Sequence, residues 1–256
     1  MKPVLGLTLS CIVYANAAEA KNDAPAIVIE PRADELLRRM SSHLGGLPRV
    51  SFHIDTSREL VTADGLKIQF HTAGDVWLRR PDKLRVDWRR DATEASLFYD
   101  GRFITVHRKG ASYFAQAPAP ATLDETIDAT RESLGGDAPA ADLLFSGPYA
   151  ILTQDVQAGA YLGLERVDDT LCHHLIFRST DVDWQIWIEE GSRPLPRKLV
   201  ITSKKMKGGP QYEARLSRWD PAPELADDLF RFTPPEGAVE VSFMGAKTNG
   251  EKGDDP

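Results

Sequence analysis

The first regular hydrophobic pattern along the chain is helical. Over residues 31–44 apolar side chains recur three and four positions apart, as on one face of an amphipathic helix. Pro31 suits the first turn of a helix, and Gly45-Gly46 follows the last apolar position. The pattern therefore predicts a helix over residues 31–44. Its apolar stripe consists of Leu36, Leu37, Met40 and Leu44.

After this helix the hydrophobic spacing changes to two, the period of a strand with one buried face. Asp64-Gly65 and Asp100-Gly101 lie between successive alternating segments and favour tight hairpin turns. The pattern predicts consecutive antiparallel strands. The alternating segments are residues 50–54, 68–70, 76–78, 84–88, 97–99, 103–106 and 113–114.

A helical segment interrupts these strands. Leu123 to Leu134 has helical spacing, with Thr122 as a cap and Gly135-Gly136 at its end. Short helical turns are expected over residues 140–145. A second group of alternating segments follows, at residues 160–164, 175–177, 184–188, 198–201 and 212–216.

Strands on both sides of a helical insertion, joined mostly by hairpin-length connections, favour one α+β domain built on a large antiparallel sheet. A sheet this long must curl or pair. No repeat or linker divides the chain, so we expect a single domain over residues 31–241. Residues 18–30 are expected to be a flexible leader, and residues 242–256, which are polar and charged, a disordered tail.

The first residues have the pattern of a cleavable signal peptide, residues 1–17. Lys2 precedes an apolar run that ends at Val13, and Ala15-Asn16-Ala17 has the small residues that a signal peptidase requires. The run is about half the ~20 residues that a membrane-spanning helix needs. Cys11 lacks the leucine usual three positions before a lipidated cysteine. We therefore expect cleavage near Ala17 and a soluble protein outside the cytoplasm, without stable membrane insertion.

Charge and cysteine content narrow the function further. The formal net charge of −7 becomes −8 when Lys2 leaves with the signal, and we identify no sustained basic tract. Binding to nucleic acid or to anionic lipid headgroups is therefore not a leading hypothesis. The mature chain keeps one cysteine, Cys172, so it cannot form an internal disulfide.

Catalytic motifs are missing from the sequence: it contains no G-x-S-x-G, P-loop, dinucleotide-binding glycine motif, H-E-x-x-H or C-x-x-C. His173 and His174 follow Cys172, but successive residues of a strand point to opposite faces, which disfavours a shared metal ion. Asp181 and Asp183 would share one face of a strand, as carboxylates in acid–base catalysis do, but solvated sheets show the same pattern. We expect no metal and no cofactor. A hydrolase using Asp181, Asp183 or His173 is a less favoured alternative.

Three ordered segments resemble the LolA/LolB-like superfamily of lipoprotein carriers of the bacterial envelope. They are DVWLRRPDKLR at residues 75–85, YDGR at 99–102 and LFRFTPPEG at 229–237. With the N-terminal helix, the resemblance spans about residues 31–241. The segment at residues 182–197 is more similar to a subfamily of predicted periplasmic proteins of uncharacterised function.

This resemblance implies a strongly curved antiparallel sheet, an incomplete barrel, whose apolar concave face is covered by helices that act as a lid. It implies that Arg80 takes part in holding the lid. The residues expected to face inward and contact acyl chains are Leu84, Val86, Trp88, Ile104, Val106, Trp184 and Ile186.

The resulting hypothesis is a soluble periplasmic protein that binds a lipid, a lipoprotein acyl chain or another hydrophobic ligand without catalysis. Its partner would be that ligand or a lipidated protein. The alternative on the same fold is an envelope sensor or regulator that binds a protein. Residues 147–180 match no motif of the superfamily, which leaves lipoprotein transfer itself open.

Overall fold

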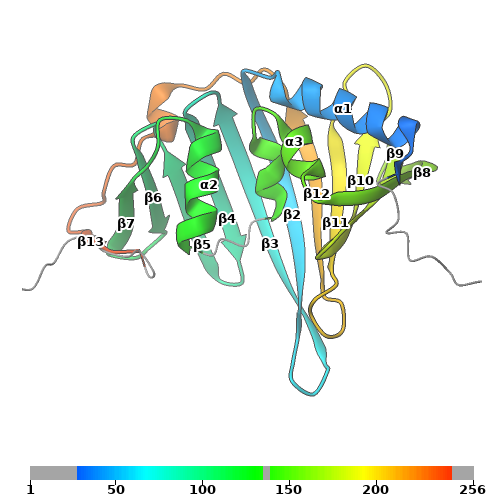
Figure 1. Ribbon diagram of the computed structural model, residues 1–256. Helices are drawn as coiled ribbons and strands as arrows, with labels where there is room; N and C mark the ends of the chain where they lie inside the picture. The colour runs from blue at the N-terminus through cyan, green and yellow to red at the C-terminus, as the bar shows by residue number, and fades with distance from the viewer. Residues whose placement is uncertain (1–27, 135–138, 244–256) are drawn as a thin grey trace, which may run out of the picture.

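The structure is a computed structural model that describes residues 28–134 and 139–243. Its main feature is one strongly curved sheet whose strand order is β1-β8-β9-β10-β11-β12-β2-β3-β4-β5-β6-β7-β13 (Figure 1). The strands of the first half are β2 (Arg49–Val61), β3 (Lys67–Arg79), β4 (Lys83–Arg90), β5 (Thr93–Tyr99), β6 (Phe103–Arg108) and β7 (Tyr113–Pro118). Those of the second half are β8 (Val156–Val167), β9 (Thr170–Ser179), β10 (Val182–Glu189), β11 (Pro196–Ser203) and β12 (Gln211–Asp220).

These strands are antiparallel to their neighbours, and pairing of β12 with β2 joins the two halves into one sheet. Two short strands, β1 (Val28–Ile29) and β13 (Val239–Val241), add to the edges in parallel orientation. The two edge strands do not pair with each other. The sheet is therefore the incomplete barrel that the resemblance implies, and the predicted α+β class with a large antiparallel sheet is confirmed.

Both predicted helices form within a residue of the expected bounds, as α1 (Pro31–Gly45) and α2 (Leu123–Leu134). The Thr122 hydroxyl accepts a bond from the Glu125 amide at 3.3 Å and donates to the Glu125 carboxylate, which caps the start of α2. The helical turns expected near residue 140 are the 3₁₀ helix η1 (Pro139–Leu144). A six-residue helix, α3 (Pro148–Thr153), was not predicted.

The expected leader, residues 18–30, needs one correction. Val28–Ile29 form β1, pair with Ala158 and Gly159 of β8, and place the Glu30 amide 2.9 Å from the carbonyl oxygen of Gly159. This pairing is non-local, so no local pattern in the sequence indicates it. The rest of the leader, the signal peptide and residues 244–256 of the expected tail lie outside the described residues.

The helices divide the concave face of the sheet into two parts. α1 packs its apolar stripe over the second half, where Ile186 and Ile188 of β10 are fully buried. α2 and η1 lie over the first half (Figure 1). An Arg38–Tyr149 hydrogen bond of 2.6 Å ties α1 to α3, and the Tyr149 hydroxyl donates to Asp34. These contacts hold α1 and α3 together.

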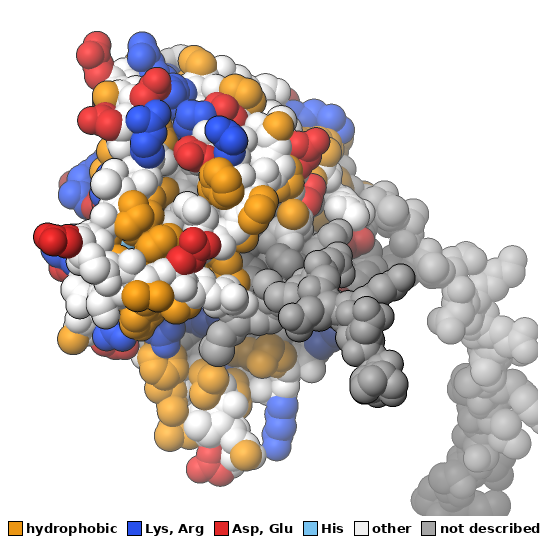
Figure 2. All heavy atoms as spheres, turned by 90° about the vertical axis from the view of Figure 1, so that its left-hand side faces the viewer, with side chains coloured by type: hydrophobic (Ala, Val, Ile, Leu, Met, Phe, Trp, Pro, Cys, Tyr) orange, Lys and Arg blue, Asp and Glu red, His pale blue; other side chains and the backbone are white. Residues whose placement is uncertain are grey.

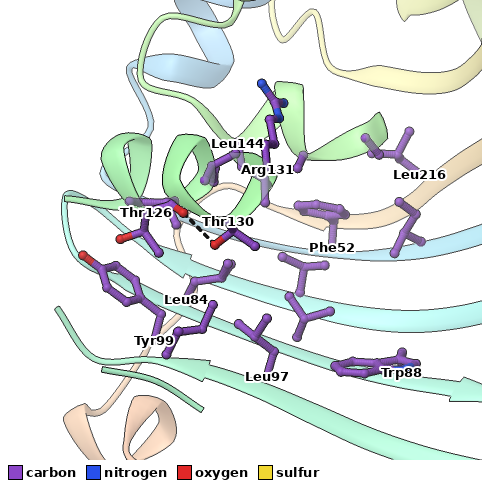
Figure 3. A pocket seen from close by; sticks show the side chains of 18 of the residues that line it. Phe52, Leu84, Trp88, Leu97, Tyr99, Thr126, Thr130, Arg131, Leu144 and Leu216 are labelled. Atoms are coloured by element: carbon purple, nitrogen blue, oxygen red, sulfur yellow. Dashed lines mark hydrogen bonds between the residues drawn. The ribbon is translucent and has the colours of Figure 1, made fainter. Parts of the chain in front are cut away.

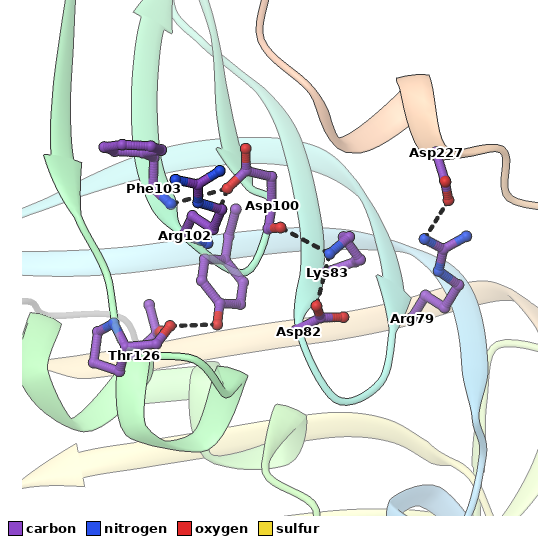
Figure 4. A network of polar contacts seen from close by, with 10 residues as sticks. Arg79, Asp82, Lys83, Asp100, Arg102, Phe103, Thr126 and Asp227 are labelled. Atoms are coloured by element: carbon purple, nitrogen blue, oxygen red, sulfur yellow. Dashed lines mark hydrogen bonds and ion pairs between the residues drawn. The ribbon is translucent and has the colours of Figure 1, made fainter.

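The convex face carries the C-terminal segment. The 3₁₀ helix η2 (Asp227–Phe230) buries Phe230 completely, and Arg79 holds it by an ion pair with Asp227 at 2.5 Å (Figure 4). Phe232 then packs among Phe98, His107 and Phe114. The motif at residues 229–237 is therefore explained by packing against the outside of the sheet.

Candidate functional site

A cavity of about 290 Å³ lies between the concave face and the α2–η1 cover (Figure 3). Its volume is close to the lower end of the range of small-molecule sites, about 300–1,000 Å³. The sheet contributes Phe52, Ile54, Val76, Leu84, Val86, Trp88, Leu97, Tyr99, Ile104, Tyr212 and Leu216. The cover contributes Leu123, Thr126, Ile127, Thr130, Arg131, Ala140, Ala141 and Leu144.

Alternation within the strands explains why the sheet side of this cavity is apolar. Leu84, Val86 and Trp88 of β4 point inward, while Arg85 and Asp87 between them form a bidentate pair on the convex face at 2.9 Å. Cross-strand neighbours repeat the pattern, because directly paired residues share a face. Val86 thus lies between Val76 and Leu97.

The hydroxyl groups of the helical wall are already bonded to the protein. Thr126 donates to the Thr122 carbonyl oxygen at 2.8 Å, and Thr130 donates to the Thr126 carbonyl oxygen at 2.7 Å (Figure 3). The Tyr99 hydroxyl donates to the Pro120 carbonyl oxygen at 2.7 Å, and burial raises the pKa of Tyr99. These groups leave little unused hydrogen-bonding capacity toward the cavity, which favours an apolar occupant.

Two further polar residues border the cavity. The guanidinium of Arg131 points away from it and pairs with Asp142 of η1, so only the aliphatic part of the side chain faces inward (Figure 3). Burial raises the pKa of Tyr212 to about 12. Tyr212 is therefore neutral at physiological pH, and neither residue brings an exposed charge to the wall.

Arg80 fastens the cover to the sheet. It follows the last residue of β3, and its guanidinium donates from Nη1 to the Leu144 carbonyl oxygen at 2.8 Å and from Nη2 to that of Phe145 at 3.0 Å. Burial lowers the pKa of Arg80, while Asp124 opposes that shift. Asp124 itself accepts the Ser146 amide at 3.0 Å, which ties α2 to the same segment.

The motif at residues 99–102 shapes the turn beside α2. Asp100 accepts the amides of Arg102 and Phe103 at 3.0 and 2.9 Å, and Lys83 links Asp82 to the Asp100 carbonyl oxygen with two bonds of 2.7 Å (Figure 4). A Cβ at Gly101 would lie 2.6 Å from Asp82, so this position requires glycine. The motif has a structural role at the wall of the cavity.

The structure separates the seven residues expected to face the ligand. Leu84, Val86, Trp88 and Ile104 line the cavity together. Trp184 lines a second pocket of about 470 Å³ between η1, α3 and β10–β11, whose surface is half polar. Ile186 and Val106 line neither pocket.

Physical reasons account for the positions of Ile186 and Val106 outside both pockets. Ile186 lies in the half of the sheet that α1 covers, where packing leaves no space and its exposure is 0%. Val106 has the same orientation as Ile104 but lies two residues further from the start of β6. At that start Ile104 pairs with Tyr99, close to α2. Sequence reasoning also missed the contributions of Phe52, Ile54 and Tyr212. Their period-two alternation was visible, but it does not tell which strands lie under the cover.

The residues considered for catalysis do not assemble into one site. Asp181 lies in the turn before β10 and pairs with Lys205 at 2.6 Å, while Asp183 pairs with Lys204 at 3.3 Å. His173 pairs with Ile188, five residues further along β10 than Asp183, and contacts Tyr161 at 3.2 Å. Asp181, Asp183 and His173 therefore do not form a common acid–base group.

The two adjacent histidines point to opposite faces, as alternation predicts. His174 stacks on Trp187 on the convex face at 4.0 Å, away from His173. Burial lowers the pKa of His173, with Arg32 adding to the shift, and burial raises the pKa of the Cys172 thiol to about 11. Among the described residues no group of three or more histidine, cysteine or acidic side chains could hold a metal ion.

Comparison with solved structures shows what the fold resembles. An uncharacterised conserved protein from Thermus thermophilus has 12% sequence identity and a TM-score of 0.50, with 83% of this chain and 99% of that chain covered. The lipoprotein LppX of Mycobacterium tuberculosis has 13% identity, a TM-score of 0.47 and coverage of 77% and 100%. A LolA superfamily protein from Nitrosomonas europaea has 15% identity, a TM-score of 0.37 and coverage of 78% and 97%.

Sequence comparison is more specific. No curated protein matches the chain. In the described part of the chain, no helix is long and apolar enough to cross a membrane. The family described as "Predicted periplasmic protein (DUF2092)" matches residues 33–244, nearly the whole of the expected domain. The similarity to predicted periplasmic proteins is thereby confirmed, and the chain belongs to the DUF2092 family.

Proposed function

We propose that this protein binds the acyl chain of a lipid or lipidated protein, or a similar hydrophobic ligand, in the α2–η1 cavity and carries it through the periplasm without chemical change. The observation that carries the proposal is the wall of the cavity. It is almost entirely hydrocarbon, and the hydroxyls of Thr126, Thr130 and Tyr99 are bonded to backbone carbonyl oxygens.

The energetics of such a site follow from its wall. Each methylene transferred from water into it contributes about 0.8 kcal/mol. About ten methylenes would contribute on the order of 8 kcal/mol, less the entropy lost on association and the cost of any opening of the cover. Such a site selects chain length and shape, and it gives little selectivity for a headgroup, because the wall presents no charge.

Movement of the cover would admit the ligand. The Arg80 bonds to Leu144 and Phe145 attach the cover to the sheet, and the Asp124–Ser146 contact joins α2 to the same segment within the cover. These are polar contacts, which can be exchanged for water more readily than a packed apolar interface. We place the entry route between η1 and the sheet, where Arg80 holds the cover.

Native mass spectrometry of the protein purified from the cell envelope tests the proposal. We expect a fraction of molecules to carry extra mass that organic extraction removes and that lipid analysis identifies as acyl-containing. The Ala141→Phe variant, which fills the cavity from η1, should lack this mass. The Ala92→Phe variant, altered at an exposed turn, should keep it.

Two results would contradict the proposal. One is a ligand-free protein that takes up no fatty acid in solution. The other is bound lipid present equally in both variants, which would place it outside the cavity. Capture of one defined envelope protein by crosslinking, with the cavity empty, would support the sensor alternative instead.

A further inference from the structure

The β2–β3 hairpin projects beyond the body of the sheet (Figure 1). Exposed apolar side chains gather on this projection (Figure 2), where Leu60 is 51%, Leu66 60% and Ile68 38% exposed. The β11–β12 turn lies against the hairpin, since a Cβ at Gly208 would lie 3.3 Å from the side chain of Val61. This turn adds Met206, which is 57% exposed. We call residues 58–70 and 204–207 the tip.

The tip has a charge opposite to that of the whole chain. It contains five basic side chains and two acidic ones, a net charge of +3 in a chain whose net charge is −7. Asp181 and Asp183 pair with two of its lysines, and the sign stays positive when they are included. The basic residues are Arg58, Lys67, Lys204, Lys205 and Lys207.

The concave face continues from the cavity to the tip. Ile54 lines the cavity, and Leu60 lies six residues further along the regularly paired part of β2, so both side chains are on the same face. Ile68 is directly opposite Leu60, and Phe70 is opposite Arg58. On this face Thr56 and Arg58 lie between Ile54 and Leu60 along β2, so apolar and polar side chains both lead from the cavity to the exposed end of the hairpin.

We propose that the tip docks the protein on an anionic lipid bilayer. Leucine, isoleucine and methionine at a narrow projection, flanked by lysines, are the elements of an interfacial membrane anchor: apolar side chains enter the acyl boundary while lysines meet anionic headgroups. The net charge of −7 of the whole chain disfavours binding to an anionic bilayer. The positive charge is concentrated at the tip, the part of the protein that would contact the bilayer. The inference goes beyond the proposed function, because it does not require the cavity to hold a ligand.

Vesicle cosedimentation tests the docking. We expect the purified protein to sediment with phosphatidylglycerol/phosphatidylethanolamine vesicles and to remain in solution with phosphatidylcholine vesicles or at high salt. The variant Lys204→Gln/Lys205→Gln/Lys207→Gln should lose roughly fivefold in affinity per lysine. The variant Leu60→Thr/Leu66→Thr/Ile68→Thr should bind at least about tenfold more weakly, since several buried methyl groups are lost. Threonine retains strand propensity, which protects the fold.

A matched control removes leucines from another exposed strand. Leu162 and Leu164 of β8 are 54% and 50% exposed, and the Leu162→Thr/Leu164→Thr variant should sediment like the unaltered protein. The Ala141→Phe variant should also sediment normally, which separates docking from ligand binding. Equal loss in the β8 and tip variants, or no sedimentation of the unaltered protein with anionic vesicles, would overturn the proposal.

Environment-sensitive fluorescence locates the contact. A dye on Leu66→Cys should shift to the blue with anionic vesicles, whereas the same dye on Leu162→Cys should not. Buried Cys172 stays unlabelled in the folded protein. A blue shift of equal size at Leu66→Cys and Leu162→Cys would show that the tip is not a membrane contact. The same conclusion would follow if the tip substitutions changed only the self-association of the protein and not its binding to vesicles.

Discussion

Nη1 of Arg80 lies 2.8 Å from the carbonyl oxygen of Leu144, which joins the end of the third strand to the 3₁₀ helix above the cavity. Nη2 of the same guanidinium donates a second hydrogen bond to the Phe145 carbonyl oxygen. The guanidinium remains charged in spite of its burial, because its ordinary pKa is far above neutrality. The Arg80 side chain thus makes two of the polar contacts that hold this part of the cover on the sheet.

Replacing Arg80 with alanine should loosen the cover without unfolding the sheet. Hydrogen bonds to charged groups contribute about 1.5–3 kcal/mol each, so the free energy of local opening should fall by at least this amount. Hydrogen exchange of peptides from α2 and η1 should accelerate, while peptides from β9 and β10 should be unchanged. Arg80→Lys should be intermediate, and Arg102→Ala, at the exposed turn after β5, should have no effect. Unchanged exchange over η1 in Arg80→Ala would contradict this role.

The sequence was most informative where structure is local. The α1 helix follows from Pro31, the leucine stripe and Gly45-Gly46, and the inward orientation of Leu84, Val86 and Trp88 follows from alternation alone. The contact of Arg80 with Leu144 joins residues 64 positions apart in the sequence. No local pattern indicates it, so it could be expected only from the resemblance to the superfamily.

The sequence does not indicate which inward-facing residues border a cavity and which are buried in a packed core. Val86 and Ile186 have the same chemistry and the same alternation, yet one borders the cavity and the other is sealed under α1. The difference arises from where the helices lie across the sheet. Edge strands of two or three residues, such as Val28–Ile29, are likewise fixed by non-local pairing.

Tyr212 should make the protein less stable at high pH. Its pKa is about 12 in the folded protein, against about 10 in the unfolded chain, because burial disfavours the phenolate. The folded state therefore keeps a proton that the unfolded state loses above pH 10. The free energy of unfolding should be unaffected below pH 10 and fall by about 1.4 kcal/mol per pH unit toward pH 12.

Urea unfolding of the unaltered protein and of Tyr212→Phe between pH 9 and 11 measures this contribution. The variant should lose less stability than the unaltered protein over this interval, and the difference should vanish at neutral pH apart from a constant offset. Parallel curves for the two proteins would show that Tyr212 has an ordinary pKa.

Cys172 should be inert in the folded protein. Burial raises its pKa to about 11, so roughly one thiol in a thousand is ionised at pH 8, and its exposure is 0%. Labelling by a thiol reagent should therefore require unfolding and follow the urea transition. A cysteine introduced at exposed Ala92 should react at once under the same conditions. Rapid native labelling of Cys172 would contradict the buried position.

The central claim, that the α2–η1 cavity holds an acyl chain, is tested most directly by fluorescence titration of the delipidated protein with a polyene fatty acid. We predict saturable binding at one site, with energy transfer from Trp88. Ala141→Phe, which removes room for two or more methylenes, should weaken binding at least about tenfold, and Ala92→Phe should bind normally. The absence of saturable binding, or equal affinity of the two variants, would contradict the account.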